Sequence, residues 1–152
     1  HYNTSMFSDD GGATWQVSDT LPDGSRGTSY GCMGGLIRLP IPGADVLLYS
    51  NLDTDAGVMP KKVGGSISTE REKVTVWASF DGGRTWPVKR LVHGGPSAYS
   101  NLGVGRPGTA SAGRIFLNYE GGAKHRYEAV HVAVFNLSWL LNGRDLREVM
   151  DR

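Results

Sequence analysis

Short apolar runs that alternate with polar residues recur along most of this chain. The clearest run covers residues 73–80, where Val74, Val76 and Ala78 share one face of an extended segment. Comparable runs occupy residues 2–8, 36–39, 46–49, 115–119 and 129–135. A period of two is typical of β-strands, and Gly- and Pro-containing segments such as 40–43 separate the runs as turns. The pattern predicts an all-β chain up to its C-terminal end.

Two segments depart from this pattern. Ser138 can cap a short helix that continues through Leu146 and Val149 and is interrupted at Gly143. Residues 53–68 contain Gly, Lys and Ser without periodicity, so we expect a long loop there. The sequence therefore divides into a β-rich region over residues 1–137 and a short C-terminal helix over residues 138–152.

Two segments of the chain repeat each other. Residues 8–15 read Ser-Asp-Asp-Gly-Gly-Ala-Thr-Trp, and residues 79–86 read Ser-Phe-Asp-Gly-Gly-Arg-Thr-Trp. Both fit the pattern Ser-x-Asp-x-Gly-x-Thr-Trp, which is known as the Asp-box. The pattern positions are Ser8, Asp10, Gly12, Thr14, Trp15, and Ser79, Asp81, Gly83, Thr85, Trp86. Internal repetition of this kind indicates a modular architecture.

The residue types of an Asp-box suit a tight turn. The carboxylate can accept bonds from nearby backbone N–H groups, and glycine adopts positive φ without a steric penalty. The indole that follows is large enough to pin the turn onto the strands beneath it. Asp10 and Asp81 could instead be catalytic carboxylates, but the turn that each one serves favours a structural role. Asp-boxes occur in β-propellers of several functions, so the repeat indicates fold more than chemistry.

The length of the chain limits how many propeller blades it can form. A blade has four strands and uses roughly 40–50 residues, so 152 residues correspond to about three blades. Propellers close with roughly four to eight blades. Three blades alone leave an apolar edge open. We therefore expect the chain to pack against a missing piece or to associate with itself.

Composition narrows the choice of partners. The formal net charge of +1 argues against a nucleic-acid partner, which requires a basic excess or stripe. No apolar run approaches the ~18 residues of a membrane span. Cys32 is the single cysteine, and we expect it to be buried, with an inter-chain bridge or a reactive thiol as the alternatives. His93, His125 and His131 stand apart in the sequence, so no metal site is predicted. The location stays open, with secretion or the lysosome favoured.

A series of segments over about residues 6–140 carries a family resemblance. After the first Asp-box come residues 31–40 (Gly-Cys-Met-Gly-Gly-Leu-Ile-Arg-Leu-Pro), 47–51 (Leu-Leu-Tyr-Ser-Asn), 71–76 (Arg-Glu-Lys-Val-Thr-Val) leading into the second Asp-box, 95–102 (Gly-Pro-Ser-Ala-Tyr-Ser-Asn-Leu), 117–120 (Leu-Asn-Tyr-Glu) and 134–140 (Val-Phe-Asn-Leu-Ser-Trp-Leu). In this order they resemble the C-terminal half of an exo-α-sialidase (neuraminidase). The resemblance implies about three blades of a six-bladed propeller. Met33 and Asn101 stand where the family has Gln and Asp.

The resemblance assigns chemistry to three positions. Tyr99 matches the family's nucleophile, and Arg71 matches one of three arginines that grip the substrate carboxylate. Glu120 matches the carboxylate that holds another of those arginines. Taken alone, each has a plainer interpretation: Tyr99 as an ordinary strand tyrosine, Arg71 as a solvated charge and Glu120 as a surface charge.

The resemblance also implies a partner and a substrate for the chain. The family's other two arginines, its general-acid Asp and the Glu that deprotonates the tyrosine all lie upstream of this segment. We therefore expect the N-terminal half of the same propeller, as a separate chain, to be a partner. The implied substrate is a sialylated glycoconjugate, hydrolysed with retention at its terminal sialic acid. No metal and no organic cofactor is implied.

Two other functions remain open. One is a non-catalytic Asp-box propeller module that binds glycans or proteins. The other is an Asp-box glycosidase that acts on neutral polysaccharides through a pair of carboxylates. The combination of Tyr99, Arg71 and Glu120 favours the sialidase, because a binding module has no need of a phenol opposite an arginine. A neutral substrate, likewise, would not need Arg71.

Overall fold

The computed structural model describes residues 5–18, 20–22, 32–53 and 71–150, together with the backbone of 61–63 and 66–68. Its strands are β1 (Ser5–Phe7), β2 (Gln16–Ser18), β3 (Gly35–Arg38), β4 (Leu47–Leu52), β5 (Lys61–Val63), β6 (Ser66–Ser68), β7 (Glu72–Ser79), β8 (Val88–Val104), β9 (Ile115–Gly121) and β10 (Ala129–Phe135). Two short helices follow, α2 (Leu137–Leu140) and α3 (Leu146–Met150). The predicted all-β fold is confirmed.

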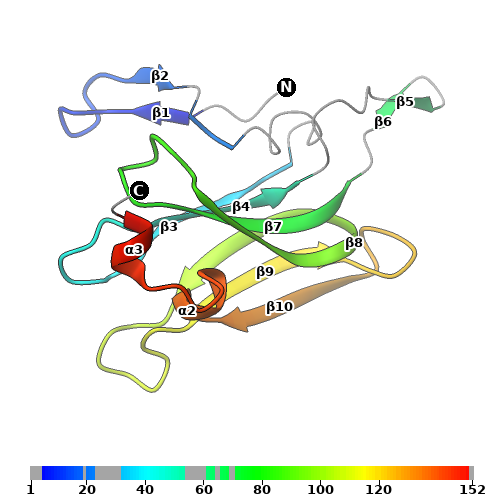
Figure 1. Cartoon of the computed structure of the whole chain (residues 1–152). Coiled ribbons are helices and arrows are strands. Elements are labelled where there is room, and N and C mark those ends of the chain that lie inside the picture. The colour runs from blue at the N-terminus through cyan, green and yellow to red at the C-terminus, as the bar shows by residue number, and fades with distance from the viewer. Residues whose placement is uncertain are drawn as a thin grey trace.

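The main sheet is antiparallel and has the strand order β10-β9-β8-β7-β4-β3. The hairpins β1-β2 and β5-β6 form two separate small sheets. Figure 1 shows the main sheet curling into a half-barrel, with β3, β4 and β7 in one wall and β9 and β10 in the other. The strand β8 is 17 residues long and belongs to both walls.

The strand order divides naturally into blade-like units. The strands β3, β4, β7 and the first part of β8 form a four-stranded antiparallel meander, which is the strand content of a propeller blade. The second part of β8 continues into a three-stranded unit with β9 and β10. The β1-β2 hairpin stands apart from both units as a two-stranded sheet. Each Asp-box turn joins two paired strands, β1 to β2 and β7 to β8.

One apolar core holds the two walls and the helices together. Its fully buried side chains include Val46, Leu48, Leu52, Val74, Val76, Ile115, Leu117 and Leu140. Leu141, which caps α2, and Val149 in α3 belong to the same cluster. In the part of the chain that the structure describes, no helix is long and apolar enough to cross a membrane.

Three details of the predicted secondary structure need correction. The cap of the C-terminal helix is Asn136, whose side chain accepts from the Trp139 N–H, and not Ser138. The chain then turns at Asn142 and Gly143, both with positive φ, so two short helices replace one interrupted helix. The predicted loop over residues 53–68 contains the β5-β6 hairpin, while residues 54–60 and 64–65 lie outside the described residues.

Candidate functional site

Arg71, Tyr99 and Glu120 lie together, although they are far apart in the sequence. Arg71 immediately precedes β7, Tyr99 lies in β8 and Glu120 lies in β9. The Arg71 Cζ is 5.7 Å from the centroid of the Tyr99 ring. The Tyr99 backbone N–H donates to Glu120 Oε2 at 3.3 Å. These three predicted site residues therefore form one cluster at the ends of β7 and β9 that flank β8 (Figure 1).

A β-bulge determines where Tyr99 points. Ser97 pairs with Gly121 and Ser100 pairs with Tyr119, so Ala98 and Tyr99 together oppose Glu120. A bulge places an extra residue on one strand and re-aims its side chains. Ala98 is buried, whereas the Tyr99 side chain is 41% exposed. The bulge therefore leaves the Tyr99 N–H outside the regular ladder, where the Glu120 carboxylate accepts from it.

The segment before β3 packs closely beside the second part of β8. The Ser100 N–H donates to the Met33 carbonyl at 3.0 Å, and the Ser50 and Ser100 hydroxyls lie 2.9 Å apart. A Cβ on Gly35 would lie 2.6 Å from the Leu102 nitrogen, so only glycine fits at this crossing. This close approach fixes the backbone that carries Tyr99.

Cys32 is completely buried, as expected, and lies close to the charges of the cluster. Burial raises the pKa of its thiol, and the positive charges of Arg71 and Arg126 act in the opposite direction. The negative charge of Glu120 adds to the rise. A buried thiol with a raised pKa holds little thiolate, so this environment disfavours the reactive-thiol alternative.

Tyr127 is a member of the cluster that sequence reasoning missed. Its hydroxyl accepts a hydrogen bond from Arg71 Nη1 at 3.1 Å. It lies in the turn between β9 and β10, where neither alternation nor the family resemblance singled it out. The available signal was a tyrosine in a short polar turn that closely follows Glu120 in the sequence.

Two histidines that seemed isolated in the sequence meet across the sheet. The His93 and His131 rings stack with centroids 6.3 Å apart, and Tyr119 lies 5.1 Å from His131 and 5.6 Å from His93. Their separation in the sequence did not reveal this contact, because neighbouring strands bring distant residues side by side. No group of three His, Cys, Asp or Glu side chains suited to a metal ion occurs within the described ranges.

The first Asp-box forms the turn that its sequence predicts. The Ser8 hydroxyl donates to Asp10 Oδ1 at 2.8 Å and accepts from the Gly12 N–H at 2.7 Å. Thr14 donates to Asp10 twice, from its backbone N–H at 2.9 Å and from its hydroxyl at 2.6 Å. These bonds, those from Thr14 foremost, hold the pKa of Asp10 well below its usual range. Trp15 is 57% exposed and bonds back to the Gly12 carbonyl rather than pinning a strand.

The second Asp-box repeats this arrangement in a more buried setting. Asp81 accepts from the Ser79 hydroxyl at 2.8 Å and from the Thr85 N–H and hydroxyl at 2.9 and 2.7 Å. Partial burial acts to raise the pKa of Asp81, but the bonds from Thr85, Ser79 and Arg84 outweigh it and lower the pKa. Here the indole does pack inward, because the Trp86 ring lies 5.9 Å from that of Tyr49.

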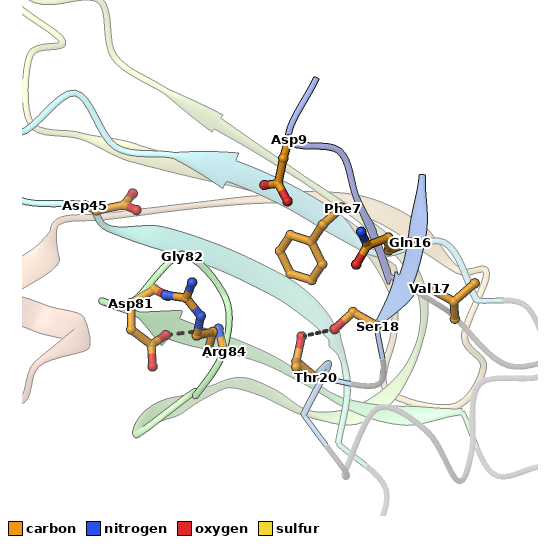
Figure 2. Close-up of a pocket in the computed structure, with 10 residues that line it drawn as sticks. All are labelled: Phe7, Asp9, Gln16, Val17, Ser18, Thr20, Asp45, Asp81, Gly82 and Arg84. Atoms are coloured by element: carbon orange, nitrogen blue, oxygen red, sulfur yellow. Dashed lines mark hydrogen bonds between the residues drawn. The ribbon is translucent and has the colours of Figure 1, made fainter. Parts of the chain in front are cut away.

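The Asp-boxes are remote from the Tyr99 cluster. Arg71 precedes β7 and Asp81 follows it, so the eight residues of the strand put roughly 25 Å between them. A cavity of about 730 Å³ lies at the Asp81 end, between the two Asp-box turns (Figure 2). Its lining includes Phe7, Gln16, Asp45 and Arg84. This remoteness supports a structural role for Asp10 and Asp81.

Comparison with known proteins shows that the chain is similar to sialidases. No protein-family model matches it. It is 30% identical over 174 residues to a sialidase of Micromonospora viridifaciens, an alignment that covers 90% of this chain and 25% of that protein. It also superposes on the Hadza microbial sialidase Hz136 with a TM-score of 0.58 and 27% identity, covering 89% of this chain and 23% of the other. The chain is a sialidase homologue.

A further solved structure matches the fold of this sialidase homologue. The intramolecular trans-sialidase from Ruminococcus gnavus, in complex with oseltamivir carboxylate, gives a TM-score of 0.61 at 20% identity. That match covers 91% of the homologue and 29% of the trans-sialidase. The homologue thus spans about a quarter of the length of the proteins it matches.

Proposed function

We propose that the chain forms part of a retaining exo-sialidase and supplies its nucleophile, Tyr99. The observation that carries the proposal is the convergence of Tyr99 in β8, Glu120 in β9 and Arg71 at the start of β7. In this proposal the protein releases terminal sialic acids from glycoconjugates without a metal or an organic cofactor.

The substrate explains why a tyrosine suits the role of nucleophile. A sialoside carries a carboxylate directly on its anomeric carbon, and this negative charge would repel an approaching Asp or Glu. A neutral phenol avoids the repulsion, and sialidases are known for using one. The Tyr99 oxygen would bond to the anomeric carbon as the bond to the leaving oxygen breaks, with the phenolic proton passing to a base and an acid protonating the leaving oxygen. Water would then attack the anomeric carbon and break its bond to Tyr99, so that the sugar leaves with net retention and the phenol regains its proton.

Arg71 would bind the substrate carboxylate next to this nucleophile. A guanidinium matches a carboxylate in shape and can give two parallel charge-assisted bonds. The separation of 5.7 Å between the Arg71 Cζ and the Tyr99 ring leaves the two groups close enough to contact one small sugar. The charge would thus fix the anomeric carbon in front of the phenol.

Glu120 would organise the site without reacting itself. Its Oε2 accepts from the Tyr99 N–H and so holds the bulge that carries the nucleophile. We propose that its other oxygen holds a second arginine of the site. That arginine, together with the acid and the base, would come from an N-terminal half of the same propeller.

Substrate choice and stereochemistry test this function in the intact protein. We expect turnover of a fluorogenic sialoside, no turnover of a neutral glucoside, and initial release of the anomer that keeps the substrate's configuration, observed by proton NMR. Tyr99→Phe should abolish turnover, whereas Tyr119→Phe, the same change on the other face of the sheet, should retain it. Turnover of the glucoside alone, or activity in Tyr99→Phe, would reject the proposal. Binding of sialosides without turnover would favour a non-catalytic module.

A further inference from the structure

The turn between β9 and β10 is organised by one carboxylate. Glu128 Oε2 accepts from the Ala123 N–H at 2.8 Å, and Oε1 accepts from the N–H groups of Lys124 and His125, each at 3.0 Å. A Cβ on Gly122 would lie 2.2 Å from Glu128 Oε2. Any side chain at position 122 would therefore collide with Glu128, and only glycine fits there. Three charge-assisted bonds to one side chain give this exposed turn a defined shape.

The defined turn presents Tyr127 to Arg71. The Tyr127 N–H donates to His125 Nδ1 at 3.3 Å, and the two rings meet edge to face with centroids 5.3 Å apart. The Arg126 guanidinium lies 5.6 Å from the centroid of the Tyr127 ring. The hydroxyl then reaches across to accept from Arg71 Nη1. Neighbouring side chains thus restrain the ring at the same time as the hydroxyl contacts the arginine.

The chemistry of the acceptor decides what this contact can do. A carboxylate in the same place would orient the guanidinium but would also neutralise its charge. A phenol accepts a hydrogen bond and carries no charge, so this contact does not neutralise the positive charge of Arg71. Tyr127 is 51% exposed, and a hydrogen bond at such a site adds little to the free energy of folding. The contact is therefore suited to orientation more than to stability.

We infer that Tyr127 is a positioning residue that aims the Arg71 guanidinium at the substrate carboxylate, and that Glu128 holds Tyr127 in place for this task. The inference rests on the proposed function for its substrate. It adds the β9-β10 turn, which the family resemblance did not assign, as a determinant of carboxylate recognition. Tyr127 acts through Arg71 and takes no part in bond making.

Ligand binding to the intact protein tests the inference. The probes are 2,3-didehydro-N-acetylneuraminic acid and its methyl ester, measured by titration calorimetry. Tyr127→Phe should weaken binding of the acid about tenfold, the usual scale for one hydrogen bond to a charged group. It should leave binding of the ester unchanged, and KM should rise while kcat stays nearly constant. In an Arg71→Lys background the same change should have no further effect, because the two residues act as one unit.

A second measurement separates this inference from the proposed function. The order parameter of the Arg71 Nε–H, from NMR relaxation, should fall in Tyr127→Phe whether or not a sialoside binds. Glu128→Gln should lower it as well, and the matched control Glu148→Gln, on the exposed face of α3, should not. Loss of binding and turnover in the parent protein, with the NMR effect intact, would reject the function alone. Unchanged order and unchanged acid affinity in Tyr127→Phe would overturn the inference.

Discussion

Thr85 donates two hydrogen bonds to Asp81, one from its backbone N–H at 2.9 Å and one from its hydroxyl at 2.7 Å. Thr14 makes the same pair of bonds to Asp10. Both oxygens of each carboxylate are therefore engaged within a turn of eight residues. An amide can accept through one oxygen only. Replacing Asp by Asn therefore removes hydrogen bonds from the turn while the side chain keeps its size.

Asp81→Asn should lower the melting temperature with little change in turnover per folded molecule. Loss of one hydrogen bond to a charged acceptor costs about 1.5–3 kcal/mol when it is well formed, and partial exposure places this one at the lower end. Circular dichroism and steady-state kinetics on the intact protein measure the two effects. Asp9→Asn, at an exposed position of the first Asp-box, is the matched control. A large loss of turnover at unchanged stability would show that Asp81 has a chemical role.

Low pH should destabilise the folded protein by protonating the aspartates of the same two turns. The folded-state pKa values of Asp10 and Asp81 lie below the unfolded value of about 3.9. Their contribution is therefore fully present above about pH 4 and is lost as the pH falls further. A double Asp10→Asn, Asp81→Asn variant should show a flatter decline of melting temperature at acid pH. Parallel curves for parent and variant down to about pH 2 would contradict this.

Gly35 and Gly103 should respond oppositely to the same substitution. Gly35→Ala places a methyl group 2.6 Å from the Leu102 nitrogen and 2.9 Å from Ser50 Oγ, whereas Gly103→Ala meets no atom within 4 Å. Overpacking of this kind costs typically 1–3 kcal/mol, so we expect Gly35→Ala to lose about that much or more. Gly103→Ala should leave stability unchanged or raise it slightly. Chemical denaturation of both variants compares them directly, and equal stabilities would disprove the steric argument.

The local features of this fold were predictable because short-range chemistry determines them. Asp10 and Asp81 accept hydrogen bonds from residues within four positions, so the Asp-box turn can be predicted from its own eight residues. The strand at residues 129–135 has the predicted bounds because its alternation is regular. Arg71, Tyr99 and Glu120 were found through the ordered family resemblance, and alternation alone would have passed over them.

The missed features depend on contacts across the sheet. The runs identified from alternation included none over residues 88–104, a segment that contains Gly94, Gly95 and Pro96. The strand β8 continues through them with register shifts against β7. The Tyr127–Arg71 bond joins residues 56 positions apart, and nothing in the spacing of either residue predicts it.

A polypeptide of residues 1–152, expressed alone, should associate with itself and show no sialidase turnover. One face of β10 exposes Val130, Val132 and Val134, at 72%, 59% and 53%. An exposed apolar strand at the edge of a sheet promotes association. Light scattering of residues 1–152 should therefore report multimers, and Val132→Thr with Val134→Thr should reduce them. A soluble monomer with turnover comparable to that of a complete sialidase would refute both parts.

Tyr99→Phe and Arg71→Lys should impair the intact enzyme in different ways. Tyr99→Phe removes the oxygen that we propose as the nucleophile and little else, so turnover should vanish while the didehydro sialic acid analogue still binds. Arg71→Lys keeps one positive charge but loses the planar fork, so bidentate contact with the carboxylate is lost. Each lost charge-assisted bond is worth about 1.5–3 kcal/mol, roughly ten- to a hundredfold in affinity. KM should then rise and kcat/KM fall together, because the carboxylate is bound in both ground and transition states. Steady-state kinetics and analogue affinity of both variants make the comparison. If the two variants lost analogue affinity equally, the division of roles between nucleophile and carboxylate anchor would be wrong.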